Sequence, residues 1–274
     1  MIVRRRACAV LLLVLILSAG GWVLRRHLPG EVRKASAAAH GATIVRYEIR
    51  SRYAHRTLAQ TAAIAGAAIA KPPMLVFLHG RGTNGNESNS NSSFYEALGK
   101  LGDRAPAVVF ANGGRASYWH NRASGDWARY VLDEVIPRAI ERLHADPRRV
   151  AIGGISMGGY GAFAIAHLRG ASFCAVGGHS PAIWLNGGES AAGAFDDSDD
   201  YDRNDILARG RAPWGNARLW LDGGRDDPFK AGTEAFAAAL GVRATHWSGE
   251  HEGAYWRAHY GSYLRFYARA LANC

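Results

Sequence analysis

The stretch Gly154-Ile155-Ser156-Met157-Gly158 decides how this chain folds. The apolar residues just before it (149–153, RVAIG) predict a short buried strand, and the Ala- and Gly-rich residues 157–168 predict a helix. The pattern G-x-S-x-G between a strand and a helix holds a serine on a sharp turn, with its hydroxyl exposed above the edge of a sheet. Small flanking residues let the strand and the helix approach closely and tolerate a strained backbone. We therefore predict that Ser156 is a catalytic nucleophile.

Strand and helix patterns alternate on both sides of this turn. Further apolar runs, typical of buried parallel strands, lie at 73–78, 107–111, 174–178, 218–221 and 243–247. Helical patterns lie at 94–101, 127–143, 233–240 and 254–272. Residues 43–50 alternate apolar and polar side chains, as an antiparallel strand does, and 56–65 is the expected hairpin partner. The order predicts an α/β fold with a mostly parallel central sheet and helices on both faces.

A serine hydroxyl is a weak nucleophile that needs a base, and the base needs an acid to orient it. With the serine on such a turn, the acid comes next in the chain and the histidine last, each on a loop after a strand. Three carboxylates, Asp222, Asp226 and Asp227, follow the strand at 218–221. Asp222 lies at the strand end, where it can cap the turn. We predict Asp227 as the acid, with Asp226 as the alternative.

The predicted base is His251, on the loop between the last strand and the last helix. Its rival, His246, lies within the strand pattern, where a packed or surface histidine is expected. An oxyanion hole needs two backbone N–H groups aimed at the developing negative charge. We assign them to Met157, directly after the serine, and to Arg81, on the glycine-containing loop after the strand at 73–78.

A second aromatic and polar cluster follows the strand at 107–111. Because loops at this edge of a parallel sheet line the site, Trp119 and His120 are candidates for substrate contact, with packing as the alternative. Tyr255 and Trp256, just after His251, can form another wall, or can bury the last helix. The acidic, Gly-rich residues 186–205 are expected to pass over the site.

Composition and the N-terminus indicate a globular protein outside the cytoplasm. The 274 residues are 48% hydrophobic and carry a formal charge of +10, but no nucleic-acid-binding motif accompanies this charge. Residues 1–28 place three arginines before an apolar stretch, as in a signal peptide or signal anchor. A linker over 29–42 and a catalytic domain over 43–274 are expected to follow. We expect the protein to be secreted or tethered to the membrane by this segment.

Only Cys174 and Cys274 follow the leader. Cys174 lies in an apolar run, so we expect it to be a free buried thiol, with a Cys174–Cys274 disulfide as the alternative. No Cys and His spacing resembles a zinc site, and no metal or cofactor is predicted.

Taken together, the chain resembles the putative-esterase group of α/β-hydrolases, which includes esterase D, feruloyl esterases and the antigen 85 mycolyltransferases. The resemblance is carried by LHGRG (78–82), YWHNRASGDW (118–127), RVAIGGISMGGYGA (149–162), DGGRDDPF (222–229) and GEHEGAYW (249–256). It implies the α/β-hydrolase fold and metal-independent ester hydrolysis through an acyl-enzyme. In esterase D the acid just before the x-Phe pair belongs to the triad, which supports Asp227. The acidic excursion is similar to that of small secreted bacterial members, and the leader argues against the formylglutathione substrate of the cytosolic members.

The first hypothesis is therefore a serine carboxylesterase acting on a small-molecule, glycan or lipid ester. A second keeps the same triad but delivers the acyl group to an alcohol in the cell envelope, as mycolyltransferases do. A third, a non-catalytic binding module on the same fold, is weak because each catalytic part has a candidate residue.

Overall fold

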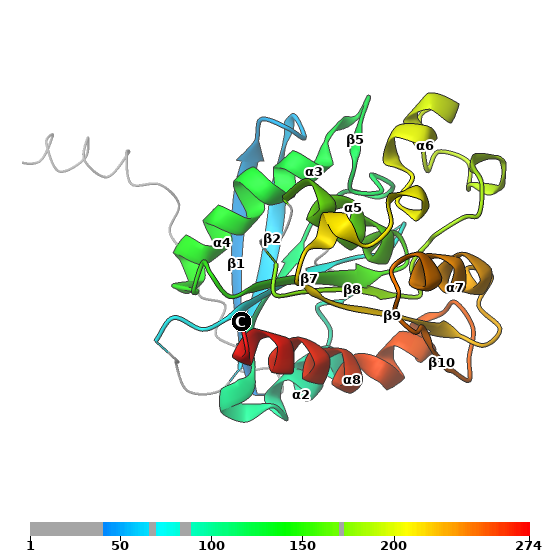
Figure 1. Ribbon diagram of the computed structural model, residues 1–274. Coiled ribbons are helices and arrows are strands. Elements are labelled where there is room, and N and C mark those ends of the chain that lie inside the picture. Colours follow the sequence, from blue (N-terminus) through cyan, green and yellow to red (C-terminus); the bar gives the residue numbers. More distant parts are fainter. Residues whose placement is uncertain (1–40, 66–69, 83–88, 170–172) are drawn as a thin grey trace, which may run out of the picture. The chain divides into compact units, whose positions relative to one another are not determined.

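A computed structural model describes residues 41–65, 70–82, 89–169 and 173–274 (Figure 1). Within them the chain forms an eight-stranded sheet in the order β1-β2-β4-β3-β7-β8-β9-β10. Its strands are β1 (Ala42–Ser51), β2 (Arg56–Ala65), β3 (Met74–Leu78), β4 (Ala107–Ala111), β7 (Val150–Ile155), β8 (Ala175–His179), β9 (Arg218–Gly224) and β10 (Thr245–Trp247). The hairpin β1–β2 joins β4 in antiparallel fashion, and all later neighbours are parallel. The predicted mostly parallel α/β architecture is confirmed.

Helices cover both faces of the sheet (Figure 1). The helices are α2 (Ser92–Gly99), α3 (Trp127–Arg129), α4 (Ile136–Leu143), α5 (Met157–Arg169), α6 (Ser198–Asn204), α7 (Lys230–Ala239) and α8 (Gly253–Ala272). One apolar cluster joins the sheet to α4, α5 and α7, and a second joins the opposite face to α2 and α8. Every residue of β3, β4, β7 and β8 is buried, which explains why these strands consist of apolar or small residues, apart from His179 at the end of β8.

The register of the parallel strands aligns the loops that carry the candidate site residues. Ile155 at the end of β7 pairs with His179 of β8, and His179 pairs with Asp222 of β9. Asp222 in turn pairs with Thr245 of β10. Since parallel strands end at the same edge of a sheet, the loops after β7, β9 and β10 all start at this edge, with β8 between β7 and β9.

Two of the differences from the sequence-based expectation have a local physical cause. The helix predicted over 127–143 contains a π-helical segment, Tyr130–Val135, between α3 and α4. Pro137, in the first turn of α4, has no N–H to donate, which accounts for an altered hydrogen-bond pattern there. Strand β9 continues to Gly224, three residues beyond its predicted end, because the two glycines that suggested a loop remain paired with β10.

The predicted leader, residues 1–28, lies outside the described residues, as does residue range 29–40 of the predicted linker. Strand β1 already begins at Ala42. In the described part of the chain, no helix combines the length and the apolar character that a membrane span requires.

A disulfide joins Cys174, one residue before β8, to Cys274 at the end of the chain. The expectation of a free buried thiol at Cys174 was wrong. Sequence patterns could not bring the two thiols together, because they are separated by 100 residues and meet only when α8 lies across the sheet.

Loss of this disulfide should lower the free energy of unfolding by about 2–5 kcal/mol, because a crosslink over so long a separation restricts the unfolded chain. We expect Cys174→Ala/Cys274→Ala to show this loss in urea denaturation, and reductant to produce a similar loss in the unmodified protein. The variant itself should not respond to reductant. Equal stability of both proteins under oxidising conditions would show that the crosslink does not contribute.

Candidate active site

Ser156 lies on a strained turn between β7 and α5. Its φ angle of 52° is in the left-handed region, which side chains with a Cβ adopt at a cost of about 1–3 kcal/mol. Its N–H donates to the carbonyl of His179 (3.0 Å), and its own carbonyl accepts from the N–H groups of Tyr160 (3.1 Å) and Ala182 (3.0 Å). Hydrogen bonds on both sides of the residue therefore hold the strained conformation.

Gly154 and Gly158 are required by the space around this turn. A Cβ at Gly154 would lie 2.5 Å from the carbonyl oxygen of Leu78 and 2.7 Å from the backbone of Gly158. A Cβ at Gly158 would collide with the same Leu78 carbonyl. The close packing of β7, α5 and the end of β3 thus depends on the two glycines of the G-x-S-x-G pattern.

His251 bridges Ser156 and Asp227. Its Nε2 lies 2.8 Å from the Ser156 hydroxyl oxygen, and its Nδ1 lies 3.2 and 3.1 Å from the two carboxylate oxygens of Asp227. The imidazole is also fixed by ring contacts with Phe229 (4.8 Å between centroids) and Trp256 (5.1 Å). The structure therefore brings together the three residues that the sequence predicts as nucleophile, base and acid.

Asp227 is buried and holds its negative charge in the folded protein. Burial alone would raise its pKa. The hydrogen bond and the charge of His251, together with the backbone N–H of Phe229 (2.8 Å), outweigh that effect and lower the pKa below its ordinary value. An ionised Asp227 can accept a hydrogen bond from the Nδ1–H group of His251. This bond keeps the proton on Nδ1, so that Nε2 is free to accept the hydrogen bond, and then the proton, of the serine hydroxyl.

The alternative residues do not reach this site. Asp226 is exposed, and its backbone N–H is bound to the carbonyl of Gly249. His246 pairs with Glu234 (3.3 Å) on α7. Asp222 is fully buried one layer below, where it accepts from other partners.

That lower layer contains a second histidine–aspartate pair, which sequence reasoning missed. His179 Nδ1 lies 2.6 Å from Asp222, and the hydroxyls of Tyr255 and Tyr263 donate to the other carboxylate oxygen at 3.2 Å. His179 Nε2 lies 2.9 Å from the hydroxyl of Tyr267. Because all three tyrosines belong to α8, the pair anchors this helix to β8 and β9 beneath the site.

The predicted oxyanion-hole residues lie beside the serine. Met157 is the first residue of α5, where backbone N–H groups have no partner within the helix. Arg81 and Gly80, on the loop after β3, line the cleft next to Ser156, and the Gly80 Cα faces the serine so closely that an added Cβ would lie 3.4 Å from the Ser156 Cβ. The structure therefore places both predicted residues next to Ser156, one in the chain and one in the cleft.

A cleft of about 660 Å³ opens above Ser156. Aromatic rings of Tyr118, Phe229 and Trp256 line it, and Arg81 and Arg257 add two cations. The excursion predicted at 186–205 contributes Ala191 to the wall. An apolar, partly cationic cleft over a serine suits an ester whose acyl or alcohol part carries flat or apolar groups.

Three residues predicted to contact the substrate do not line the cleft. Trp119 and His120 are buried: Trp119 packs its ring against His79, and His120 binds Asp200 at 3.0 Å. Tyr255 is buried with its hydroxyl on Asp222. We correct these assignments.

Their neighbours Tyr118 and Trp256 reach the cleft instead. Consecutive helix residues point in directions about 100° apart, so only one of Tyr255 and Trp256 can face it. Tyr118 and Trp119 both have left-handed backbone conformations (φ 50° and 62°). No pattern in the sequence predicts this turn of the backbone. The aromatic and polar cluster after β4 correctly indicated a segment that lines the cleft. The sequence did not predict which of its side chains point into the cleft.

His79 supports the oxyanion loop from below. It is fully buried, its Nδ1–H donates to the Gly80 carbonyl (2.8 Å), and its Nε2 accepts from the N–H of Gly113 (3.0 Å). Burial lowers its pKa to about 4, although the bond to Gly80 acts in the opposite direction. The neutral imidazole is therefore a structural link between the loops after β3 and β4.

We expect His79 to make the protein acid-sensitive. Between the ordinary histidine pKa of about 6.5 and the folded value of about 4, the unfolded state binds a proton that the folded state does not. The free energy of unfolding should therefore fall with decreasing pH over this window, by up to about 1.4 kcal/mol per pH unit. In His79→Gln, the free energy of unfolding, measured by urea denaturation at several pH values, should depend less steeply on pH. The difference in slope should correspond to about one proton. An NMR titration showing His79 charged at pH 6 would contradict this account.

Among the described residues, no group of three or more His, Cys, Asp or Glu side chains is placed to hold a metal ion.

Comparisons with known proteins identify the family of the chain. A family model described as Putative esterase matches residues 66–268. No protein among the curated sequences matches the chain.

Solved structures resemble the fold at low sequence identity. A ferulic acid esterase superposes with a TM-score of 0.71 at 20% identity, covering 84% of this chain and 99% of its own. An S-formylglutathione hydrolase from Agrobacterium tumefaciens gives 0.69 at 18% identity, covering 86% and 98%. MPT51 of Mycobacterium tuberculosis gives 0.63 at 17% identity, covering 82% and 97%. Since the family model matches most of the chain, the protein belongs to the family described as Putative esterase and is a hydrolase of the serine esterase type.

Proposed function

We propose that the protein is a carboxylesterase in which Ser156, His251 and Asp227 act as nucleophile, base and acid. The observation that carries the proposal is the unbroken path from the Ser156 hydroxyl through the His251 imidazole to the buried Asp227 carboxylate, at the floor of an open cleft. This arrangement activates a serine for attack on a carbonyl carbon.

In the first half of the reaction, the Ser156 oxygen attacks the ester carbonyl while His251 Nε2 takes its proton. The carbonyl oxygen becomes negative and is stabilised by the backbone N–H groups of Met157 and Arg81. His251 then returns the proton to the alcohol oxygen, the carbon–oxygen bond to the alcohol breaks, and the acyl group remains on Ser156.

In the second half, His251 takes a proton from water, and the resulting hydroxide equivalent attacks the acyl-enzyme. Collapse of the second tetrahedral intermediate releases the carboxylic acid and restores the serine hydroxyl. Asp227 stays ionised throughout, holding the imidazole in place and stabilising its charged form.

We also propose that the catalytic domain works outside the cytoplasm. The Cys174–Cys274 disulfide supports this, because such crosslinks persist in oxidising compartments and are rare in the cytosol of most organisms. The basic and apolar residues 1–28 support export or tethering.

A panel of p-nitrophenyl esters with acyl chains of increasing length, together with methyl ferulate, tests the proposed reaction. We expect hydrolysis of at least the short, activated esters. The same assay with added sugar or glycerol acceptors separates hydrolysis from acyl transfer: a transferase would form the new ester at the expense of free acid. Absence of turnover with every ester, in protein shown to be folded, would contradict the proposal.

A further inference from the structure

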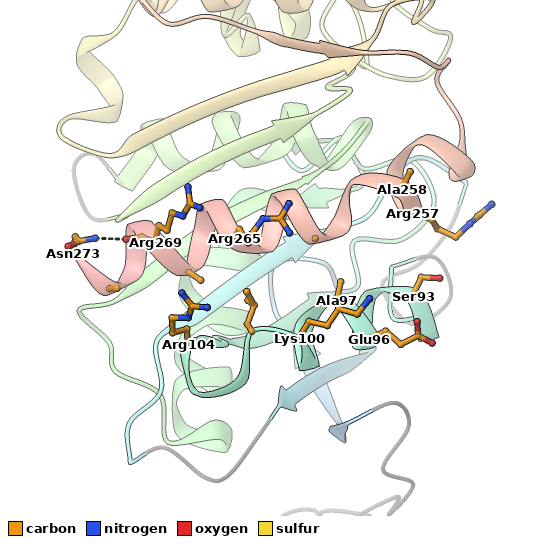
Figure 2. Close-up of a pocket in the computed structure, with 14 residues that line it drawn as sticks. Ser93, Glu96, Ala97, Lys100, Arg104, Arg257, Ala258, Arg265, Arg269 and Asn273 are labelled. Carbon is orange, nitrogen blue, oxygen red and sulfur yellow. Dashed lines mark hydrogen bonds between the residues drawn. The ribbon is translucent and has the colours of Figure 1, made fainter.

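A basic groove lies between α2 and α8, on the face of the sheet opposite to α5 (Figure 2). Its volume is about 590 Å³. Five cations line it, against a single carboxylate, that of Glu96. The cations are Lys100, Arg104, Arg257, Arg265 and Arg269. We call this feature the basic groove.

The sequence of α8 explains its shape. Arg257, Gly261, Arg265 and Arg269 follow one another at intervals of four residues, so they form one row along the helix. Gly261 leaves a gap in that row, and alanines of α2 and α8 leave little bulk between the walls. Figure 2 shows Lys100 and Arg104 on the facing wall.

The cations of the basic groove lack internal counter-charges. All five side chains are exposed, and among the described residues none has a carboxylate within ion-pair distance. Within the part of the chain that the structure describes, Arg265 alone of the three arginines in the row has a side-chain hydrogen bond, to the hydroxyl of Ser262 (2.9 Å). Arg265 and Arg269 are like charges four residues apart, which destabilise a helix, and an anionic ligand would offset their repulsion.

The basic groove and the cleft over Ser156 meet at one residue. Arg257 lines both the groove and the cleft over Ser156, and its neighbours Trp256 and Tyr260 line the cleft. From Arg257 to Arg269 the helix extends about 18 Å, at 1.5 Å per residue. A ligand that fills the groove from Arg257 to Arg269 is therefore longer than a small anion, and it leads away from the serine.

We propose that the basic groove binds an acidic polysaccharide, so that an ester carried on the same chain enters the cleft at Ser156. This inference rests on the proposed esterase function and names the substrate class. Repeated carboxylates match the row of arginines, whose guanidinium groups bind carboxylates in bidentate fashion. A hollow between two helices can hold a single extended chain. A flat lipid surface would instead contact mainly the outer sides of the two helices and would not enter the groove. The rings of Tyr118 and Trp256 in the cleft offer flat faces for sugar rings.

Partly O-acetylated polygalacturonate is the test substrate, with equally acetylated xylan as the neutral comparison and p-nitrophenyl acetate as the small ester. Arg265→Gln/Arg269→Gln is the test variant, because neither residue lines the cleft. At low salt we expect its KM for the acidic polymer to rise on the order of tenfold. Its kinetics on xylan and on p-nitrophenyl acetate should stay unchanged. Added salt should raise the KM of the unmodified protein for the acidic polymer. The difference in KM between the unmodified protein and the variant should therefore become smaller.

Arg50→Gln/Arg243→Gln is the matched control, since it removes two exposed arginines that do not line the basic groove. It should behave as the unmodified protein. Lys100→Gln/Arg104→Gln, on the facing wall, should reproduce the tenfold effect. Equal KM values for the acidic polymer in the unmodified protein and both groove variants would overturn the proposal, as would no preference for that polymer over xylan.

Direct binding separates failure of this inference from failure of the esterase proposal. Calorimetry with unesterified polygalacturonate should show binding that the groove variants lose and the control keeps, even if no ester is turned over. Binding to polyphosphate or to vesicles of phosphatidylglycerol that depends on Arg265 and Arg269, without binding to polygalacturonate, would overturn the assignment to a polysaccharide.

Discussion

Ser156→Ala is expected to lower kcat for an activated short-chain ester by about five to six orders of magnitude, the scale seen when a serine hydrolase loses its nucleophile. In the proposed reaction the hydroxyl oxygen forms the acyl-enzyme, and Ser156 is the only serine, threonine or cysteine among the described residues that line the cleft. The left-handed backbone of residue 156 is equally strained with alanine, so the turn should persist. Steady-state hydrolysis of p-nitrophenyl acetate measures the loss, and urea denaturation checks the fold.

Ser248→Ala is the matched control, because Ser248 is an exposed serine on the loop before His251, and its hydroxyl accepts a hydrogen bond from the Arg225 side chain at 3.5 Å. Its activity should stay near that of the unmodified protein. Turnover of Ser156→Ala within tenfold of the unmodified protein would show that the reaction does not pass through this serine.

Asp227→Asn is expected to lower kcat by about four orders of magnitude, because an amide cannot hold the imidazole in the required tautomer or stabilise its charged form. Asp226→Asn should change kcat by no more than a few-fold, since the Asp226 side chain is exposed and outside the hydrogen-bonded path. The two variants differ by one position and remove the same charge, so their comparison isolates the contact with His251. A larger loss in Asp226→Asn would transfer the role of acid to that residue.

Because the pKa of Asp227 is lowered in the folded state, its contribution to the free energy of unfolding depends on pH and can be measured. The folded state favours the ionised carboxylate, so this group stabilises the protein above the ordinary aspartate pKa, and the contribution is lost as the pH falls through the lowered value. Asp227→Asn should lack that loss at acidic pH, whereas Asp226→Asn should retain it.

The sequence could predict the sheet and the loops that carry the candidate triad because both follow from local patterns. Buried strands are apolar runs, and the strand–turn–helix around Ser156 needs glycines at fixed positions. Parallel strands end at one edge, so a serine, an acid and a histidine on successive loops meet there. The structure places Ser156, Asp227 and His251 within hydrogen-bond distance, and their catalytic roles stay predictions until the variants are measured.

Side-chain direction and long-range contacts could not be predicted in the same way. Whether Tyr118 or Trp119 faces the cleft depends on two left-handed residues in one loop. The His179–Asp222 pair and the disulfide join strands or ends far apart in the chain. The basic groove likewise needs α2 and α8 to lie side by side, although the spacing of the α8 arginines was visible in the sequence.

Covalent labelling tests the central claim most directly. The full-length protein is treated with a fluorophosphonate, its intact mass is measured, and the labelled peptide is sequenced by mass spectrometry. The account predicts one phosphonyl group per chain, on Ser156, and little labelling in His251→Ala because an unactivated serine is a poor nucleophile. A folded protein that takes up no label, or takes it up on a residue other than Ser156, would contradict the account.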